Sequence, residues 1–191
     1  MNRIVFLLED RSMKVLLDGL LPRIFPDLQF LCLSHEGNQD LEKSIPRKLR
    51  AWQEPGVRFV VIRDNDGGEC DALKDRLQGL CSEGRREDSL VRIACQEIEA
   101  WYLGEPQALA QAYNDESLRG IGNTARYRDP DAVQRPSDEL SRIAPAFQKV
   151  SGARLVAKLL SRERNRSRSF HVTIDGIARL QAQMQRDQTD L

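Results

Sequence analysis

The sequence lacks the patterns that most directly assign a chemistry. None of its four cysteines belongs to a C-x-x-C pair and the two histidines lie far from them, so we expect no zinc site. Isolated thiols are instead typical of a reducing cytosol. No G-x-G-x-x-G follows a predicted strand, and no G-x-x-x-x-G-K-[ST] occurs. The usual glycine-rich sites for dinucleotides and nucleoside triphosphates are therefore not expected.

Long apolar runs are also missing. No stretch approaches the roughly 20 apolar residues that a membrane helix needs. The run at residues 4–8 is too short for the core of a signal peptide, and Glu9-Asp10-Arg11 follows it directly. We therefore expect a cytoplasmic protein without a membrane partner. The length of 191 residues allows one sizeable domain, or a core with an extension.

Charge is unevenly distributed although the net charge is zero. Residues 141–180 contain nine cations and two anions, a net charge of +7, so the remainder of the chain carries −7. A basic segment on an acidic body favours a polyanionic partner such as nucleic acid. Arg154, Lys158, Arg166 and Arg168 are the candidate contacts to its backbone. The alternative is a solvated helix face followed by a charged loop.

Apolar runs alternate with helical patterns in the first half of the chain. Strands are predicted over 4–8, 28–33, 59–62 and 89–95. Helices are predicted over 13–21 with Ser12 as N-cap and with Pro22 and Pro26 closing it, over 40–52 with a break near Pro46, over 69–81, and from 97 to 103. This order predicts an α/β fold with a parallel sheet flanked by helices.

The pattern changes after residue 105. We predict an α/β core over 1–105 and a mostly helical C-terminal extension over 106–191, packed on the core. Helices are expected in the extension over 108–112, 137–149, 152–162 and 172–184, and an Arg/Ser-rich loop over 162–169.

An acidic pair follows the strongest predicted strand. Asp64 and Asp66 form a D-x-D at its end, and Gly67-Gly68 allows a tight turn beneath them. Hard cations such as Mg²⁺ take one or two carboxylates together with water and phosphate oxygens. The pair therefore fits a metal that binds a phosphodiester. Alternatively, Asp66 or a neighbour caps the next helix and Asp64 lies in a solvated turn.

Two further acidic groups follow predicted strands. Glu9 ends the first strand, and Glu97 and Glu99 follow the fourth. Sites in parallel sheets form at the carboxyl ends of strands, so these groups could reach the same crevice. Glu97 and Glu99 share a face on an extended backbone but diverge on a helix. Either could instead interact with a helix N-terminus.

These residues resemble a known domain. A hydrophobic strand ending in Glu, followed by a helix and a later strand ending in D-x-D, is similar to the Toprim domain of topoisomerases, primases and related nucleases, over about residues 3–104. Four segments resemble a bacterial Toprim-like family of unknown function, whose members are often encoded beside AAA-type or SMC-like ATPases in defence-like gene clusters. They are FLLEDRSMKVLLDGLLPRI, VVIRDNDGGECDALKDRL, VRIACQEIEAWYLGE and SRSFHVTIDGIARL.

The resemblance implies roles for particular residues. The Toprim pattern implies Glu9 as metal ligand or general acid/base and Asp64 and Asp66 as magnesium ligands, and the family pattern adds Glu97 and Glu99 as acidic site residues. It also draws attention to Lys74, Lys149 and Ser169. The chain departs from the pattern in having Asp10 where Gly usually follows Glu, and Phe147 where Tyr is more usual. We thus predict Glu9, Asp64, Asp66 and Glu97 as catalytic, and these four with Glu99 as metal ligands.

Two functions follow as hypotheses. The first is a Mg²⁺- or Mn²⁺-dependent nuclease or related phosphoryl-transfer enzyme in a defence system with an ATPase partner, with Lys74, Lys149 and the basic segment holding nucleic acid. The second is a non-catalytic Toprim-fold subunit that binds an ATPase partner, nucleic acid or both. Cleavage of small nucleotides would use the same carboxylates as the first.

Overall fold

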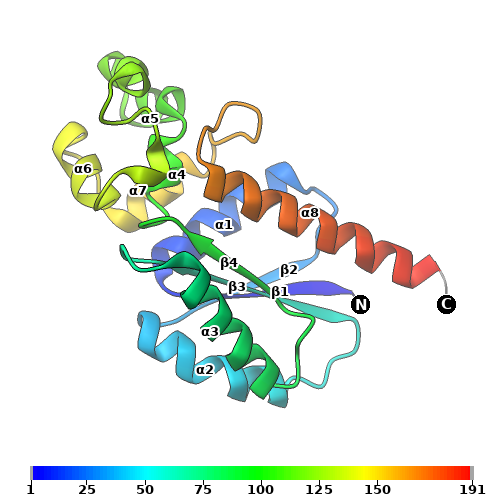
Figure 1. Ribbon diagram of the computed structural model, residues 1–191. Coiled ribbons are helices and arrows are strands. Elements are labelled where there is room, and N and C mark those ends of the chain that lie inside the picture. The colour runs from blue at the N-terminus through cyan, green and yellow to red at the C-terminus, as the bar shows by residue number, and fades with distance from the viewer. Residues whose placement is uncertain (1, 190–191) are drawn as a thin grey trace.

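A computed structural model describes residues 2–189 and has a four-stranded parallel sheet at its centre (Figure 1). The strands are β1 (Arg3–Leu8), β2 (Phe30–Ser34), β3 (Val57–Asp64) and β4 (Leu90–Ala94), in the order β2-β1-β3-β4. All three pairings are parallel. The predicted parallel sheet with flanking helices is confirmed, as a Rossmann-like α/β arrangement.

Helices cover both faces of this sheet. They are α1 (Arg11–Ile24), α2 (Asn38–Ala51), α3 (Cys70–Glu83), α4 (Ala100–Leu103), α5 (Pro106–Tyr113), α6 (Pro136–Ile143), α7 (Lys149–Val156) and α8 (Arg168–Thr189), with two 3₁₀ segments, η1 (Glu116–Asn123) and η2 (Pro130–Ala132). In Figure 1, α2 and α3 lie on one face and α1 and α8 on the other, while α4 to α7 gather beyond the carboxyl ends of the strands.

Alternation of side chains along the strands builds two apolar layers. Val5 and Leu7 of β1 pack with α2 and α3, whereas Ile4, Phe6 and Leu8 pack with α1 and the C-terminal helices. Successive strand residues point to opposite faces, so one apolar run serves both layers. The second layer contains side chains from α5 to α8 as well as from β1 and α1. Residues after 105 are thus part of the same hydrophobic core as the sheet.

The predicted start and end of the first helix were wrong. Asp10, not Ser12, is the N-cap: its carboxylate accepts a 2.8 Å hydrogen bond from the Met13 amide, and the Ser12 hydroxyl donates to the same group. Pro22 lies inside α1 rather than closing it, and the helix continues to Ile24. The Asp10 carboxylate therefore caps the helix that follows β1.

Several other boundaries also differ from the prediction. Helix α2 passes Pro46 without a break. Residues 97–99 form a turn, so the helix that was expected to begin at residue 97 is only the short α4, which begins at Ala100. Helices α6 and α7 are shorter than predicted, because residues 144–148, which include Pro145, form a separate link between them. Helix α8 begins inside the Arg/Ser run that was expected to be a loop, and it extends past 184.

Candidate functional site

The chain changes direction across the sheet between β1 and β3. From β1 it passes to β2 on one side, and β3 then pairs with the other side of β1. In open parallel sheets, ligands bind in the crevice outside the carboxyl ends at such a switch point. Glu9 directly follows β1 and Asp64 ends β3, so the structure places both carboxylates at this crevice.

Glu9 is held against the end of β3. The backbone amide of Asp64 donates to Glu9 Oε2 at 3.2 Å, and Arg63 Nε lies 3.7 Å from the same oxygen. Burial, followed by the charge of Asp66, raises the pKa of Glu9 to about 7, although the Asp64 amide and Arg63 oppose the shift. The Glu9 carboxylate is therefore a desolvated group surrounded by like charge.

The D-x-D loop is fastened to the loop after β4. The Asn65 side chain donates to the Gly68 carbonyl at 2.8 Å and accepts from the Gln96 amide, while the Asp66 amide donates to the Gln96 carbonyl at 3.0 Å. Asp66 and Gln96 both adopt left-handed backbone conformations, with φ of 49° and 62°. The N-cap of α3 is Glu69, which makes no side-chain capping bond. Asp64 and Asp66 therefore do not cap the following helix.

Asp64 and Glu99 are buried carboxylates without hydrogen-bond partners for particular oxygens. Within residues 2–189, Asp64 Oδ1 and both carboxylate oxygens of Glu99 have no partner. Burial and then the charge of Glu99 raise the pKa of Asp64 well above its usual value. Burial likewise raises the pKa of Glu99 to about 7, and Lys149 opposes this shift. A buried ionised group normally has a paired charge, hydrogen bonds or a metal, so this pair needs a cation or protons.

Tyr102 lies near Glu99 and was not among the site residues predicted from the sequence. Its hydroxyl is buried and has no hydrogen-bond partner within the described chain. Burial and the charges of Glu99, Asp10 and Asp64 raise the pKa of this phenol well above its usual value. Its place three residues after Glu99 on one helical turn was the available signal.

Glu97 and Glu99 have separate environments, as expected for residues that do not share an extended strand. The Glu97 carboxylate accepts from the Ser137 amide at 2.7 Å and from the Ser137 hydroxyl at 2.9 Å, at the N-terminus of α6. Lys149 Nζ lies 3.7 Å from Glu97 Oε1. The charges of Glu99, Glu97 and Asp64 raise the pKa of Lys149 against its own desolvation. Lys149 is thus the ammonium group facing the acidic site.

The carboxylates of the candidate site do not by themselves form a complete metal-binding group. Within the described residues, no group of three or more His, Cys, Asp or Glu side chains could hold a metal ion. Mg²⁺ is commonly held by one or two carboxylates with water and substrate phosphates. The unpartnered oxygens of Asp64 and Glu99, together with the mutual repulsion of Glu9, Asp64 and Asp66, are consistent with that requirement.

The other predicted basic residues are dispersed. Lys74, Arg154, Lys158 and Arg168 are exposed and make no ion pair or hydrogen bond through their side chains within residues 2–189. Arg166 instead donates to the carbonyls of Gly122 at 2.9 Å and Tyr127 at 3.2 Å, so it fastens the loop after α5.

Ser169 is buried and is hydrogen-bonded to residues outside the acidic site. It accepts from the Trp101 indole at 2.9 Å, and its amide donates to Asp131 at 2.8 Å. Phe147 is buried in the apolar core. Its ring and the Tyr113 hydroxyl both lie against Gly152. The resembled family usually has Tyr at position 147, where this chain has Phe. Tyr113 therefore places a phenol close to the Phe147 ring.

Comparison with known protein families supports one assignment. Residues 8–177 match a family described as a domain of unknown function, DUF4276. The chain belongs to this family. The DUF4276 match includes every predicted acidic site residue, and its description names no activity. Comparisons with curated proteins and with solved structures give no match. No helix within residues 2–189 is long and apolar enough to cross a membrane.

Proposed function

We propose that this DUF4276 protein is a Toprim-related, Mg²⁺- or Mn²⁺-dependent enzyme that cleaves phosphodiester bonds in nucleic acid. The observation that carries the proposal is the pair of buried carboxylates, Asp64 and Glu99, whose oxygens lack partners beside Glu9 at the switch point of the sheet. Carboxylates that crowd together without sufficient countercharge are suited to bind a divalent cation.

Each acidic residue has a distinct part in this proposal. Asp64 and Glu99, with Asp66 at the edge of the site, would supply oxygen ligands that water and substrate phosphates complete. Glu9, with its pKa raised to about 7, can accept and return a proton near neutral pH. Glu97 is held by Ser137 and orients Lys149. A divalent cation bound here would activate a water molecule and stabilise the charge that develops on the phosphodiester.

The polyanionic substrate class rests on one cation at the site, Lys149, and on exposed cations elsewhere on the chain. Lys149 faces the carboxylates, and Lys74, Arg154, Lys158 and Arg168 are exposed cations without partners in the described chain. Such cations bind phosphate backbones irrespective of sequence. An AAA- or SMC-like ATPase partner in a defence system is a further part of the proposal that rests on the family resemblance alone.

The test combines cation uptake with cleavage. Titration calorimetry with MnCl₂ should show binding that Asp64→Ala abolishes and that Asp75→Ala, an exposed aspartate on α3 without a partner in residues 2–189, leaves unchanged. Plasmid and single-stranded substrates should be cleaved with Mg²⁺ or Mn²⁺, with losses of 100-fold or more for Asp64→Ala and Glu9→Gln. Glu87→Gln, at an exposed glutamate outside the site, is the control for Glu9→Gln.

Two results would redirect the assignment. Cleavage that survives both Asp64→Ala and Glu9→Gln would show that another site or a contaminant is responsible. Absence of manganese uptake, together with a stable complex with an ATPase that does not depend on the carboxylates, would support the non-catalytic subunit instead.

A further inference from the structure

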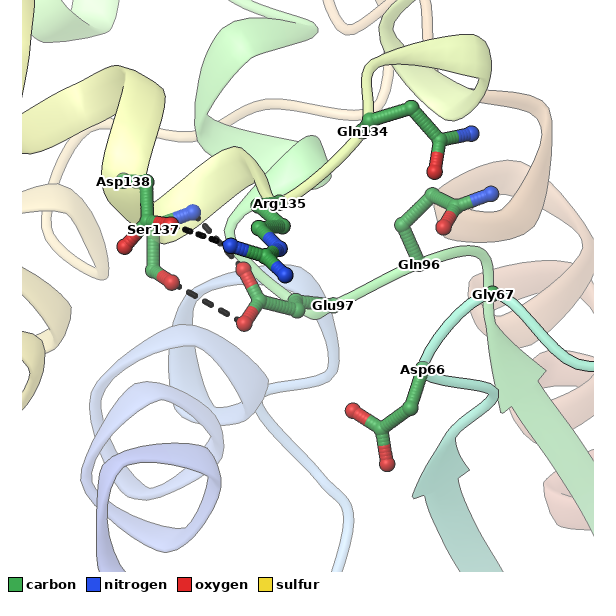
Figure 2. Close-up of a pocket in the computed structure, with 8 residues that line it drawn as sticks. All are labelled: Asp66, Gly67, Gln96, Glu97, Gln134, Arg135, Ser137 and Asp138. Carbon is green, nitrogen blue, oxygen red and sulfur yellow. Dashed lines mark hydrogen bonds and ion pairs between the residues drawn. The ribbon is translucent and has the colours of Figure 1, made fainter.

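A polar pocket of about 450 Å³ lies directly beside the acidic site. It is lined by Asp66, Gly67, Gln96, Glu97, Gln134, Arg135, Ser137 and Asp138 (Figure 2). Its size is within the roughly 300–1,000 Å³ of small-molecule sites. Every side chain that lines it is polar or charged. The pocket therefore suits a ligand that makes hydrogen bonds and carries charge, and not an apolar molecule.

Unusual backbone conformations gather around this pocket. Five non-glycine residues in the described chain have positive φ, and three of them, Asp66, Gln96 and Arg135, line the pocket. Such conformations cost of order 1–3 kcal/mol each and are concentrated at functional sites. Gln96 and Arg135 come from different loops, one after β4 and one before α6. The backbone thus turns two polar side chains toward one cavity.

Three of the groups that face the pocket, the amides of Gln96 and Gln134 and the guanidinium of Arg135, make few interactions within residues 2–189. The side-chain amides of Gln96 and Gln134 make no hydrogen bond within residues 2–189, and Figure 2 shows them on the same side of the pocket. Arg135 has a side chain that is 84% exposed, and its ion pair to Asp138 spans 3.9 Å. Exposed pairs of this kind contribute little. The guanidinium, which lies above Glu97 in Figure 2, is therefore available to a ligand.

The chemistry of these groups identifies a ligand class. A guanidinium binds phosphate oxygens in a bidentate manner. A glutamine amide offers both a donor and an acceptor, which matches the edge of a nucleobase. Both kinds of group lie next to Asp66 and Glu97, the edge of the proposed catalytic site. A base can present its edge to such a pocket only when it is unpaired.

We propose that this pocket binds one unpaired nucleotide of a single-stranded nucleic acid, with its phosphate on Arg135 and its base edge facing Gln96 and Gln134. The choice of nucleic acid as the polymer rests on the proposed function. The proposal adds a preference for single strands and two residues that determine which base is preferred.

The experiment uses nucleoside monophosphates as probes. Binding of AMP, GMP, CMP and UMP, and of inorganic phosphate, is measured by NMR titration of the full chain with and without Mg²⁺. Arg135→Asn removes the guanidinium and keeps a residue that tolerates positive φ. Arg85→Asn is the matched control, because Arg85 is exposed, has φ of 61° and lies outside the pocket. Circular dichroism checks that each variant is folded.

We expect at least one monophosphate to bind ten-fold or more tightly than inorganic phosphate. Arg135→Asn should weaken it at least ten-fold, Gln134→Ala should alter the order of preference among the four bases, and Arg85→Asn should change nothing. Equal binding of phosphate and monophosphates, or unchanged binding in Arg135→Asn, would overturn the proposal. If the protein is a cation-dependent nuclease but Arg135→Asn binds nucleotides as tightly as the wild type, the proposed function stands and the subsite is rejected. Nucleotide binding that Arg135→Asn abolishes, in a protein without manganese uptake, would support the subsite and reject the nuclease.

Discussion

The backbone amide of Asp64 donates a 3.2 Å hydrogen bond to Oε2 of Glu9, which joins the ends of β1 and β3 across 55 residues of sequence. This bond turns the Glu9 carboxylate toward β3 at the switch point of the sheet. Because Asp64 is itself buried beside Glu99, three carboxyl groups share one poorly solvated region. Their mutual repulsion predicts that the stability of the fold depends on pH.

The metal-free protein should lose stability as the pH rises from about 5 to 8. The pKa values of Glu9 and Glu99 are about 7 in the folded chain, against an ordinary value of 4.5. Between these values the folded state binds more protons than the unfolded state, so the free energy of unfolding falls with rising pH and levels off above about 7. We expect a fall of several kcal/mol in urea denaturation, since one pKa unit corresponds to about 1.4 kcal/mol and both carboxyl groups contribute.

The Glu99→Gln variant should flatten this pH profile, because the amide cannot ionise. Asp75→Asn, at an exposed site on α3, should leave the slope unchanged. A stability that rises over the same range, or a slope that Glu99→Gln leaves intact, would show that these carboxyls do not carry the repulsion.

Removal of the Lys149 ammonium should alter cation affinity. Lys149 Nζ lies 3.7 Å from Glu97, and its charge lowers the pKa of Glu99. Lys149→Met should destabilise the metal-free protein by about 0.5–1 kcal/mol at pH 8, as for a partly exposed ion pair. It should also strengthen manganese binding several-fold, because the incoming cation meets less repulsion. Calorimetry measures both effects against Lys158→Met, which removes an exposed cation without a partner in the described chain. Equal manganese affinities of Lys149→Met and Lys158→Met would show that the Lys149 charge does not act on the bound cation.

The sheet could be predicted from the sequence because its signal is local. The continuous apolar runs of β1 and β3 are what strands buried on both faces require. The predicted helix boundaries were wrong where local sequence signals misled. Asp10 rather than Ser12 is the N-cap of α1, and Pro22 and Pro46 lie inside helices instead of ending or breaking them. Apolar packing on the sheet stabilises α1 and α2 enough to accept the lost hydrogen bonds.

The candidate site was predictable only in part. Strand ends suggested that Glu9, Asp64 and Asp66 would meet, because parallel strands end at one edge. The burial of Glu99 depends on the tertiary packing around α4, which no local pattern encodes. Arg166 is bound to loop carbonyls, whereas Arg168 has no ion pair within residues 2–189, and this difference also arises from tertiary contacts.

Arg166 and Arg168 should respond differently to substitution. Arg166 donates to the carbonyls of Gly122 and Tyr127, so Arg166→Ala should cost about 1–3 kcal/mol of stability by leaving these acceptors without partners. Arg168→Ala should change stability by less than about 0.5 kcal/mol. If Arg168 contacts a nucleic-acid backbone, its loss should reduce the salt dependence of binding by about one unit of slope. Thermal denaturation and fluorescence anisotropy at several salt concentrations measure the two effects. Equal losses of stability would contradict the assignment of separate roles.

Asn65 should control the geometry of the D-x-D loop. Its side chain donates to the Gly68 carbonyl and accepts from the Gln96 amide, and so connects the loops after β3 and β4. Asn65→Ala removes these two bonds, together with a 3.2 Å bond from Asn65 Nδ2 to Cys70 Sγ, at a buried position and should cost about 2 kcal/mol. It should also weaken manganese binding, because Asp66 at φ 49° would lose the contacts that hold its backbone.

Asn65→Asp separates the two contributions. It keeps an acceptor for the Gln96 amide but loses the donor to Gly68 and adds a negative charge beside Asp64. Its stability at pH 8 should therefore be lower than that of Asn65→Ala, and added Mn²⁺ should recover part of the difference. Asn123→Ala, at an exposed position in η1, controls for loss of an asparagine. Manganese affinity that is unchanged in both Asn65 variants would show that the loop holds its conformation without this side chain.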